Sequence, residues 1–145
     1  MPSRPVMKVI QHRDFLVAKP ETRVQDVAIL MKKHQIGAVL ITDNEGCLIG
    51  ICTERDLAFD IVAANLDPQE TPVSAIMTHD PQTIPPDKPF GHALHLMFEG
   101  GFRHMPVVDP YGRPMGVVYS RDALSLEILQ FGKELERRES LEKIL

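Results

Sequence analysis

The sequence predicts a mixed α/β (α+β) fold made of two β-α-β-β-α units in tandem, and three observations support this prediction. The stretch GICTERD, which begins at Gly50, returns as GVVYSRD, which begins at Gly116, at an offset of 66 residues. The same offset aligns many other identical residues without a gap. In each copy, extended and helical hydrophobic periods follow one another in the same order. Because one such unit cannot bury its apolar face alone, we expect the copies to pack together with pseudo-two-fold symmetry.

The identities at this offset run along the whole repeat. They include Ile10–Ile76, Asp14–Asp80, Pro20–Pro86, Leu30–Leu96, Met31–Met97, Asp43–Asp109, Gly46–Gly112, Arg55–Arg121 and Asp56–Asp122. We therefore place the first unit at residues 1–66, the second at 67–130 and a C-terminal helical tail at 131–145. The proline-rich, polar stretch 65–72 predicts a linker between the units.

The elements of the first unit follow from hydrophobic period and turn chemistry. Pro20 disfavours helix in the residues just before it, so the unit begins with a short extended segment. Apolar residues three to four apart then predict an amphipathic helix, and two apolar runs around the polar turn DNEG predict a hairpin. The expected ranges are 15–18 (extended), 24–34 (helix), 38–42 and 47–52 (hairpin strands) and about 53–64 (second helix).

The second unit repeats this order, with PYG at the turn of its hairpin. The expected ranges are 92–99 (helix), 105–108 and 115–119 (strands), and a final helix from about Arg121. After Gly132 the stretch KELERRESLEKIL is helix-forming and heavily charged, with only a few apolar points. Such a helix is typical of a surface or of a dimer seam, and it carries no recognisable chemistry.

Composition narrows the classes of function. The chain of 145 residues is 43% hydrophobic, which is enough for a packed core, and its net charge of −4 gives no basic excess for nucleic-acid binding. No apolar run approaches the roughly 20 residues that cross a bilayer, and the start of the chain lacks the apolar stretch of a signal peptide. We expect a soluble, cytoplasmic protein without nucleic-acid or membrane partners.

Neither a metal site nor a catalytic site is indicated. Cys47 and Cys52 fit no zinc knuckle or CxxC redox motif, so we interpret them as small buried hydrophobes. His92 and His95 share a helical face, but no further ligands stand beside them. The sequence also lacks a P-loop, a nucleophile elbow and paired carboxylates with distinct roles. We therefore expect no enzyme activity, no metal and no catalytic cofactor.

Two units that each close on glycine, two apolar residues, a polar residue and Arg-Asp resemble the CBS domain pair, or Bateman module. The resemblance rests on IGAVLITDNEG and GICTERDL in the first unit and on SAIMTHDPQTIPPD, FRHMPVVDPYG and GVVYSRDAL in the second. It implies a stand-alone regulatory module with two clefts between the units, which bind AMP, ADP, ATP, an NAD-type dinucleotide or S-adenosylmethionine. It also implies a homodimeric disc and an effector protein whose identity is unknown. The apolar helix faces, which exceed what one pair can bury, fit the dimer.

The residues of the first motif, GICTERD, have the chemical groups needed to bind such a ligand. Gly50 has no Cβ, which would let the backbone approach a ligand closely, and Ile51 and Cys52 would flank a flat base. Thr53 stands at a helix start, where its hydroxyl and unpaired N–H groups favour a phosphate. Asp56, one turn later, can accept hydrogen bonds from both hydroxyls of a ribose.

The same pattern also has a purely structural interpretation. Thr-x-x-Asp forms a capping box, in which Thr53 and Asp56 only satisfy the first N–H groups of a helix. The second copy retains Asp122 but has Tyr119 in place of the threonine. A pure cap should preserve the hydroxyl before the carboxylate, so this departure favours ligand binding. A dimerisation module without a ligand is the alternative function.

We rank the Asp56 cleft above the Asp122 cleft, because Tyr119 could stack on a ligand there or obstruct it. Carried over from the resemblance, the walls of the Asp56 cleft also include Thr78, Thr83, Ile84, Arg103, His104 and Met105. Those of the Asp122 cleft include Gln11, Leu16, Ile36, Gly37, Ala38, Val117, Tyr119 and Arg121. Among these, Arg103 suits a phosphate, and His104 could titrate near neutral pH.

Overall fold

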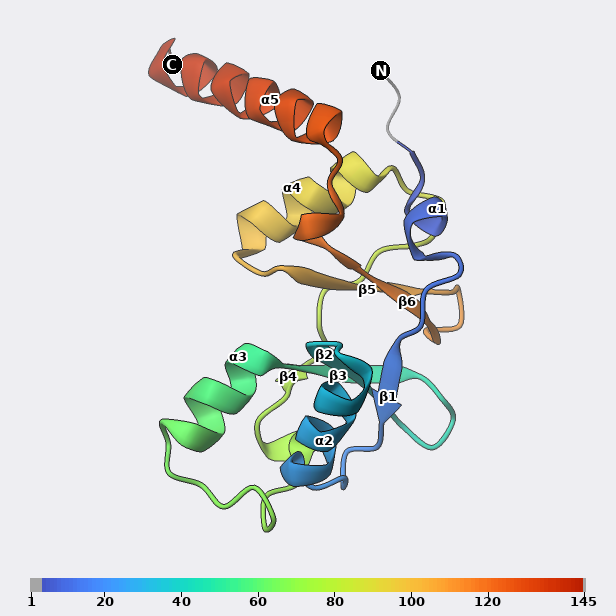
Figure 1. The fold of residues 1–145 in the computed structure, drawn as a ribbon. Helices are drawn as coiled ribbons and strands as arrows, with labels where there is room; N and C mark the ends of the chain where they lie inside the picture. Colours follow the sequence, from blue (N-terminus) through green and yellow to red (C-terminus); the bar gives the residue numbers. More distant parts are fainter. Residues whose placement is uncertain (1–3, 145) are drawn as a thin grey trace.

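Two units lie one above the other, each with a small sheet that faces the other unit (Figure 1). The structure is a computed structural model, and it describes residues 4–144, apart from the side chains of residues 125, 126 and 140–144. The lower unit contains a four-stranded sheet of order β1-β2-β3-β4, and the upper unit contains the two-stranded sheet β5-β6. This confirms the mixed fold of two similar units.

The first unit follows the predicted order of elements. Its strands are β1 (Leu16–Ala18), β2 (Ala38–Thr42), β3 (Leu48–Thr53) and β4 (Thr78–His79), and its helices are α2 (Val24–His34) and α3 (Glu54–Leu57). Strand β2 pairs in parallel with β1 and antiparallel with β3. The bounds of α2 and β2 agree with the prediction, whereas the second helix changes after α3 into a π-helical turn, Ala58–Val62.

The second unit contains α4 (Phe90–Gly100), β5 (His104–Val108), β6 (Pro114–Tyr119) and α5 (Ser125–Ile144). The final helix does not begin at Arg121 as expected, because a short 3₁₀ turn, Ser120–Asp122, is followed by extended backbone at Ala123. The side chain of Glu127 then accepts the N–H of Leu124 at 2.8 Å, close to the new helix start. Helix α5 continues through Gly132 and projects away from both sheets (Figure 1).

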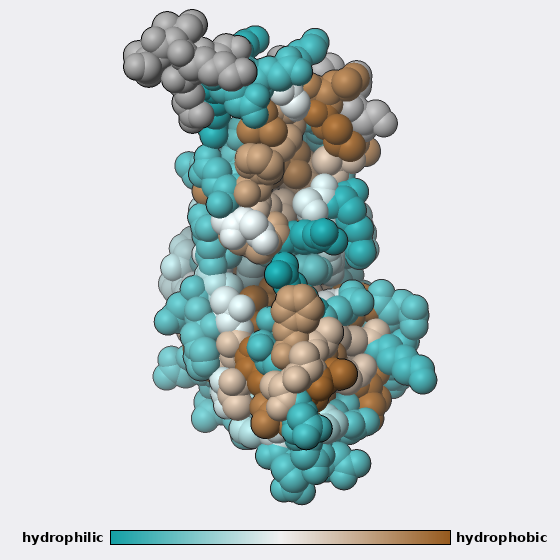
Figure 2. Space-filling model, turned by 90° about the vertical axis from the view of Figure 1, so that its left-hand side faces the viewer, coloured by the Kyte–Doolittle hydropathy of each residue, from teal (hydrophilic) through white to brown (hydrophobic). Residues whose placement is uncertain are grey.

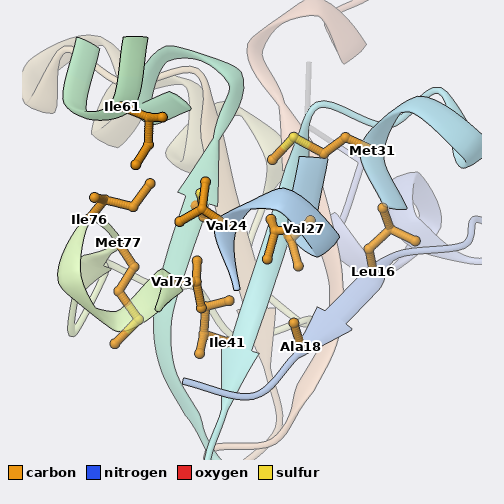
Figure 3. Packing of buried hydrophobic residues seen from close by; sticks show 12 residues of the cluster. Leu16, Ala18, Val24, Val27, Met31, Ile41, Ile61, Val73, Ile76 and Met77 are labelled. Atoms are coloured by element: carbon orange, nitrogen blue, oxygen red, sulfur yellow. The ribbon is translucent and has the colours of Figure 1, made fainter. Parts of the chain in front are cut away.

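The first segment of each half of the sequence packs on the core of the other half. Helix α1 (Val6–Ile10) contributes three buried residues to the core of the second unit. The 3₁₀ turn Val73–Ala75 and the residues after it join the core of the first unit, and β4 pairs with β3. Figure 3 shows Val73, Ile76 and Met77 pointing into the same core as the side chains of α2. Both cores are therefore closed by a segment from the other half of the sequence.

A third cluster of buried residues joins the two sheets. It consists of Ala38, Leu40 and Ile51 from the first unit and Val117 and Tyr119 from the second. Ile51 and Val117 occupy matching positions in the repeat, so this cluster lies about the pseudo-two-fold axis. The motifs at the ends of β3 and β6 therefore meet at the junction of the units.

Large apolar side chains remain exposed on helices of both units and, at Leu124, on the segment just before α5. We call this set the apolar helix face, and it comprises Phe59, Val62, Phe98, Leu124, Ile128 and Leu129. Figure 2 shows the corresponding side of the molecule, where brown residues gather over both units and hydrophilic residues lie between them. Within residues 4–144, no helix combines the length and the apolar character that a membrane crossing requires.

Candidate functional site

The two motifs have the same backbone arrangement at the junction of the units. The N–H of Glu54, directly after β3, donates to the carbonyl of Gly37 at 3.0 Å. The N–H of Ser120, directly after β6, donates to the carbonyl of Arg103 at 3.0 Å. Each motif is thus joined to the start of the neighbouring hairpin strand, and the repeat in sequence is a repeat in geometry.

The motif glycines make room for protein side chains. A Cβ on Gly50 would lie 2.4 Å from Sδ of Met77, and a Cβ on Gly116 would lie 2.9 Å from Cβ of Ile10. Met77 and Ile10 both come from the segments that the units exchange. The expectation that Gly50 lets the backbone approach a ligand is therefore corrected. The glycine is needed because an exchanged segment passes directly over the strand.

We expect Gly116→Ala to lower the free energy of unfolding by about 1–3 kcal/mol, because Cβ of Ile10 is tied to its backbone and cannot move aside freely. Gly50→Ala should cost less, since the flexible end of Met77 can rotate away. Chemical denaturation followed by circular dichroism measures both. Gly132→Ala is the matched control, because no atom lies within 4 Å of its added Cβ, and a helical alanine should stabilise the chain. Equal stability of the Gly116 and Gly132 variants would contradict this packing.

Thr53 and Asp56 form a reciprocal helix cap. Oδ2 of Asp56 accepts the N–H of Thr53 at 2.9 Å and its hydroxyl at 3.2 Å, and Oγ1 of Thr53 accepts the N–H of Asp56 at 3.5 Å. The unpaired N–H groups and free hydroxyl expected for a phosphate are thus largely satisfied by the protein. Oδ1 of Asp56 accepts no hydrogen bond from the part of the chain that the structure describes. Burial raises the pKa of Asp56, and the bonds from Thr53 oppose this shift.

Asp122 keeps the carboxylate half of the cap without a threonine. Its Oδ2 accepts the N–H of Tyr119 at 2.7 Å. The replacement of threonine by tyrosine therefore does not exclude a capping role, contrary to the expectation from the sequence. Unlike Asp56, Asp122 is also paired with a cation. Nη1 and Nη2 of Arg13 donate to its two oxygens at 2.8 and 3.0 Å.

The ring of Tyr119 is surrounded by basic groups. The guanidinium of Arg121 lies 4.5 Å from its centroid and that of Arg13 lies 5.5 Å away. The ring of His104 meets it edge-on at 5.1 Å. Burial, helped by the charges of Arg121 and Arg103 and opposed by Glu54, lowers the pKa of His104. His104 therefore lies between the two motifs and senses charges from both.

Because the folded-state pKa of His104 is lowered, the unfolded chain takes up this proton first as the pH falls. We expect stability to be lost as the pH drops below the ordinary histidine value of about 6.5 and approaches the lower folded value. His104→Gln should reduce this loss between about pH 7 and pH 5, measured as the melting temperature. His34→Gln, at an exposed position of α2, is the control. Equal pH profiles for wild type and His104→Gln would contradict the assignment.

Four of the expected wall residues point into the unit cores. Side chains alternate along a strand, so when Ile51 faces the opposite sheet, its neighbour Cys52 faces the core. Burial raises the pKa of the Cys52 thiol to about 12. The four residues, which were expected in the cleft walls, are Leu16 and Cys52 in the first core and Ile84 and Met105 in the second. Their side chains belong to the unit cores and not to the cluster that joins the two sheets.

The other expected residues have different surroundings. Thr78 pairs with Ile51 across β3 and β4, and the side chain of Glu54 covers Gly37. Those buried between the sheets are Ile51, Ala38, Val117 and Tyr119. Those that are exposed are Gln11, Thr78, Arg103 and Arg121, and those of intermediate exposure are Ile36, Gly37, Thr53, Asp56, Thr83, His104 and Asp122. Among the side chains that the structure describes, no group of three or more potential metal ligands is found.

Sequence reasoning missed two charged residues at the junction. Arg13 reaches Asp122, which lies 109 positions away in the sequence. Glu54 covers Gly37 and influences His104. A signal for Arg13 was present, because it directly precedes Asp14 and the repeat places another basic residue, His79, before the matching Asp80. No comparable pattern marks Glu54, whose counterpart is Ser120.

Comparison with known proteins gives consistent matches. The family model described as the CBS domain matches residues 6–63 and 73–128. An uncharacterized 17.7 kDa protein of Acidianus ambivalens is 34% identical over 83% of this chain and 74% of its own length. An uncharacterized protein of Methanopyrus kandleri is 33% identical over 81% of this chain, which spans 60% of that protein.

A solved structure resembles the chain over most of its length. It is the CBS domain pair of protein MJ0100 in complex with 5′-methylthioadenosine and S-adenosyl-L-methionine. The match has a TM-score of 0.76 at 30% identity and covers 91% of this chain and 99% of that one. The arrangement of two stacked units therefore recurs in a protein that binds adenosyl compounds.

Proposed function

The chain belongs to the CBS domain family, with two CBS domains in tandem, and on this premise we propose that it is a non-enzymatic regulatory module that binds an adenosine-containing small molecule. The domain pair of MJ0100, 30% identical, was crystallised with two compounds that share adenosine. Ligand binding between the units would stabilise one arrangement of the chain over others, and this shift in population is the signal. An effector protein would receive it.

The free oxygen of Asp56 carries this proposal. Oδ2 is held by Thr53, which fixes the orientation of the carboxylate, while Oδ1 accepts no hydrogen bond within residues 4–144. A pre-positioned carboxylate binds a diol without first losing conformational freedom. We assign the ribose to Asp56 and the surrounding polar wall to Thr53, Thr78 and Thr83. Arg103 supplies the positive charge of the same cleft, and His104 lies next to it in the sequence.

We also propose that two copies associate through the apolar helix face. Phe59 and Val62 are 58% and 77% exposed in the first unit, and Phe98 is 59% exposed in the second. Apolar area of this extent on both units favours burial against a partner. Sedimentation equilibrium of wild type and of a Val62→Glu variant tests the homodimer. A wild-type monomer at micromolar concentration would contradict it.

The second candidate function is a dimerisation module that binds no ligand. The complete cap between Thr53 and Asp56 favours it, because capping alone then accounts for the geometry of this motif. This candidate and the sensor differ in one measurable property, which is stabilisation by an adenosyl compound.

A thermal-shift panel separates the two candidates. AMP, ADP, ATP, NAD, 5′-methylthioadenosine and S-adenosylmethionine are each added to the full chain. A ligand that binds only the folded form stabilises it by about 2.7 kcal/mol at 100 times its dissociation constant, and so raises the melting temperature. We expect at least one of the six to do so. If none does, the sensor function is wrong and the dimerisation module is favoured.

A further inference from the structure

We propose that Arg13 occupies the Asp122 carboxylate in place of a ligand, so that the two clefts are not equivalent and only the Asp56 cleft is open. The inference rests on the proposed function, because it concerns access to the second of the two related clefts. Arg13 acts as a tethered competitor built into the chain. Removal of its side chain opens a second binding site.

The contact engages both oxygens of the Asp122 carboxylate. Arg13 donates from two nitrogens to both oxygens of Asp122, and Oδ2 additionally accepts the N–H of Tyr119. The side chain of Asp122 is 10% exposed and that of Arg13 is 34% exposed. A bidentate pair between a guanidinium and a carboxylate is a strong, charge-assisted interaction. The diol of a ribose is uncharged and is a weaker partner for the same oxygens.

Arg13 is delivered by a packed segment. Its N–H donates to the carbonyl of Ile10 at 3.1 Å, and Ile10 is 3% exposed in the core of the second unit. The guanidinium also lies over the ring of Tyr119 and reaches the carbonyl of Val117 at 3.5 Å. The Asp122 turn is further held by Arg4, which donates to the carbonyl of Asp122 at 2.8 Å. Helix α1 therefore positions the arginine as well as closing the core.

The first cleft has no equivalent of this pair. The repeat places His79 at the position that matches Arg13. His79 is exposed, and its Nε2 lies 3.0 Å from the carbonyl of Ser74 in its own segment. Oδ1 of Asp56 is consequently left without a donor from residues 4–144. The same carboxylate is thus open in one copy of the motif and neutralised in the other.

The contact with Arg13 should weaken ligand binding at the Asp122 cleft. When a site is competent only while an internal group is withdrawn, the apparent dissociation constant rises in inverse proportion to the competent fraction. An arginine that holds the carboxylate for nine-tenths of the time or more weakens the second site about tenfold or more. The wild-type chain should then bind one equivalent of ligand at concentrations where a variant without Arg13 binds two.

Isothermal titration calorimetry of the full chain with 5′-methylthioadenosine tests this. The probe is uncharged, so loss of an arginine cannot weaken a phosphate contact and obscure the result. We expect one equivalent per chain for wild type and two for Arg13→Gln, with the second affinity improved about tenfold or more. Arg13→Lys keeps the charge without the bidentate geometry, and should give an intermediate second affinity. Because it is the milder change, it serves if Arg13→Gln does not fold.

Arg23→Gln is the matched control, since Arg23 pairs with Asp26 at 3.1 Å on the exposed surface of the first unit. It should bind one equivalent, as wild type does. In the Arg13→Gln background, Asp122→Ala should remove the second equivalent and Asp56→Ala the first. Two equivalents for wild type, or one for both Arg13 variants, would overturn the inference while leaving the sensor function intact. If neither wild type nor any variant binds an adenosyl probe, the proposed function itself fails.

Discussion

Asp56→Ala is expected to weaken the binding of 5′-methylthioadenosine by about 100-fold or more. A ribose diol can donate two hydrogen bonds to this carboxylate, and each hydrogen bond to a charged group contributes about 1.5–3 kcal/mol. The carboxylate is already oriented by Thr53, so the wild-type chain spends little free energy on arranging it. The dissociation constant from calorimetry measures the effect.

The variant also loses its helix cap, which we expect to cost about 1 kcal/mol of stability. We expect the fold of the variant to stay nearly intact, as the sequence already indicates. The small loss of stability comes from the missing hydrogen bond between residue 56 and Thr53. Thr53→Ala is the control, because it removes the hydroxyl of the cap and leaves the carboxylate in place. It should lose a similar amount of stability but weaken binding much less than Asp56→Ala does, because the N–H of residue 53 still donates to Oδ2 of Asp56. Normal binding by Asp56→Ala would show that the ligand site lies elsewhere.

Ile10→Ala is expected to lower the free energy of unfolding by about 2–5 kcal/mol in the core of the second unit, although the residue lies in the first half of the sequence. Its side chain is 3% exposed and belongs to the core formed by α4, β5 and β6. Truncation leaves a cavity beside Gly116, and a rigid core closes such a cavity only in part. Denaturant unfolding measures the loss.

Met7→Ala is the control for this change, because Met7 lies in the same short helix but is 42% exposed. We expect its effect to stay within about 0.5 kcal/mol. Ile76→Ala, at the matching position of the repeat, should destabilise the first core, since Ile76 is 8% exposed there. Similar stabilities for Ile10→Ala and Met7→Ala would refute the exchange of segments between the units.

The exchange also links the cores to the clefts. Ile10 supports the second core, and Arg13, three residues later, binds the carboxylate of the Asp122 cleft. A displacement of Arg13 by a ligand would therefore act on the end of a segment that is packed in the core. This connection is a physical route by which the state of that cleft can reach the rest of the second unit.

The local elements of the fold follow from the sequence by itself. The bounds of α2 and β2, the hairpin turns and the two-fold repetition depend on periods and turn residues within a few positions of each other. The repeat also predicts that Asp56 and Asp122 occupy equivalent positions in the two clefts. These features can be predicted from the sequence because residues close together in the chain determine them.

Tertiary structure alone decided how the motifs are used. Gly116 is small because Ile10 passes over it, Cys52 faces a core because Ile51 faces the opposite sheet, and Arg13 holds Asp122 although 109 positions separate them. Each of these relations depends on which distant segment covers which face of a sheet. The hydrophobic period of a strand or helix indicates that one of its faces is buried. It does not indicate which distant segment of the chain packs on that face.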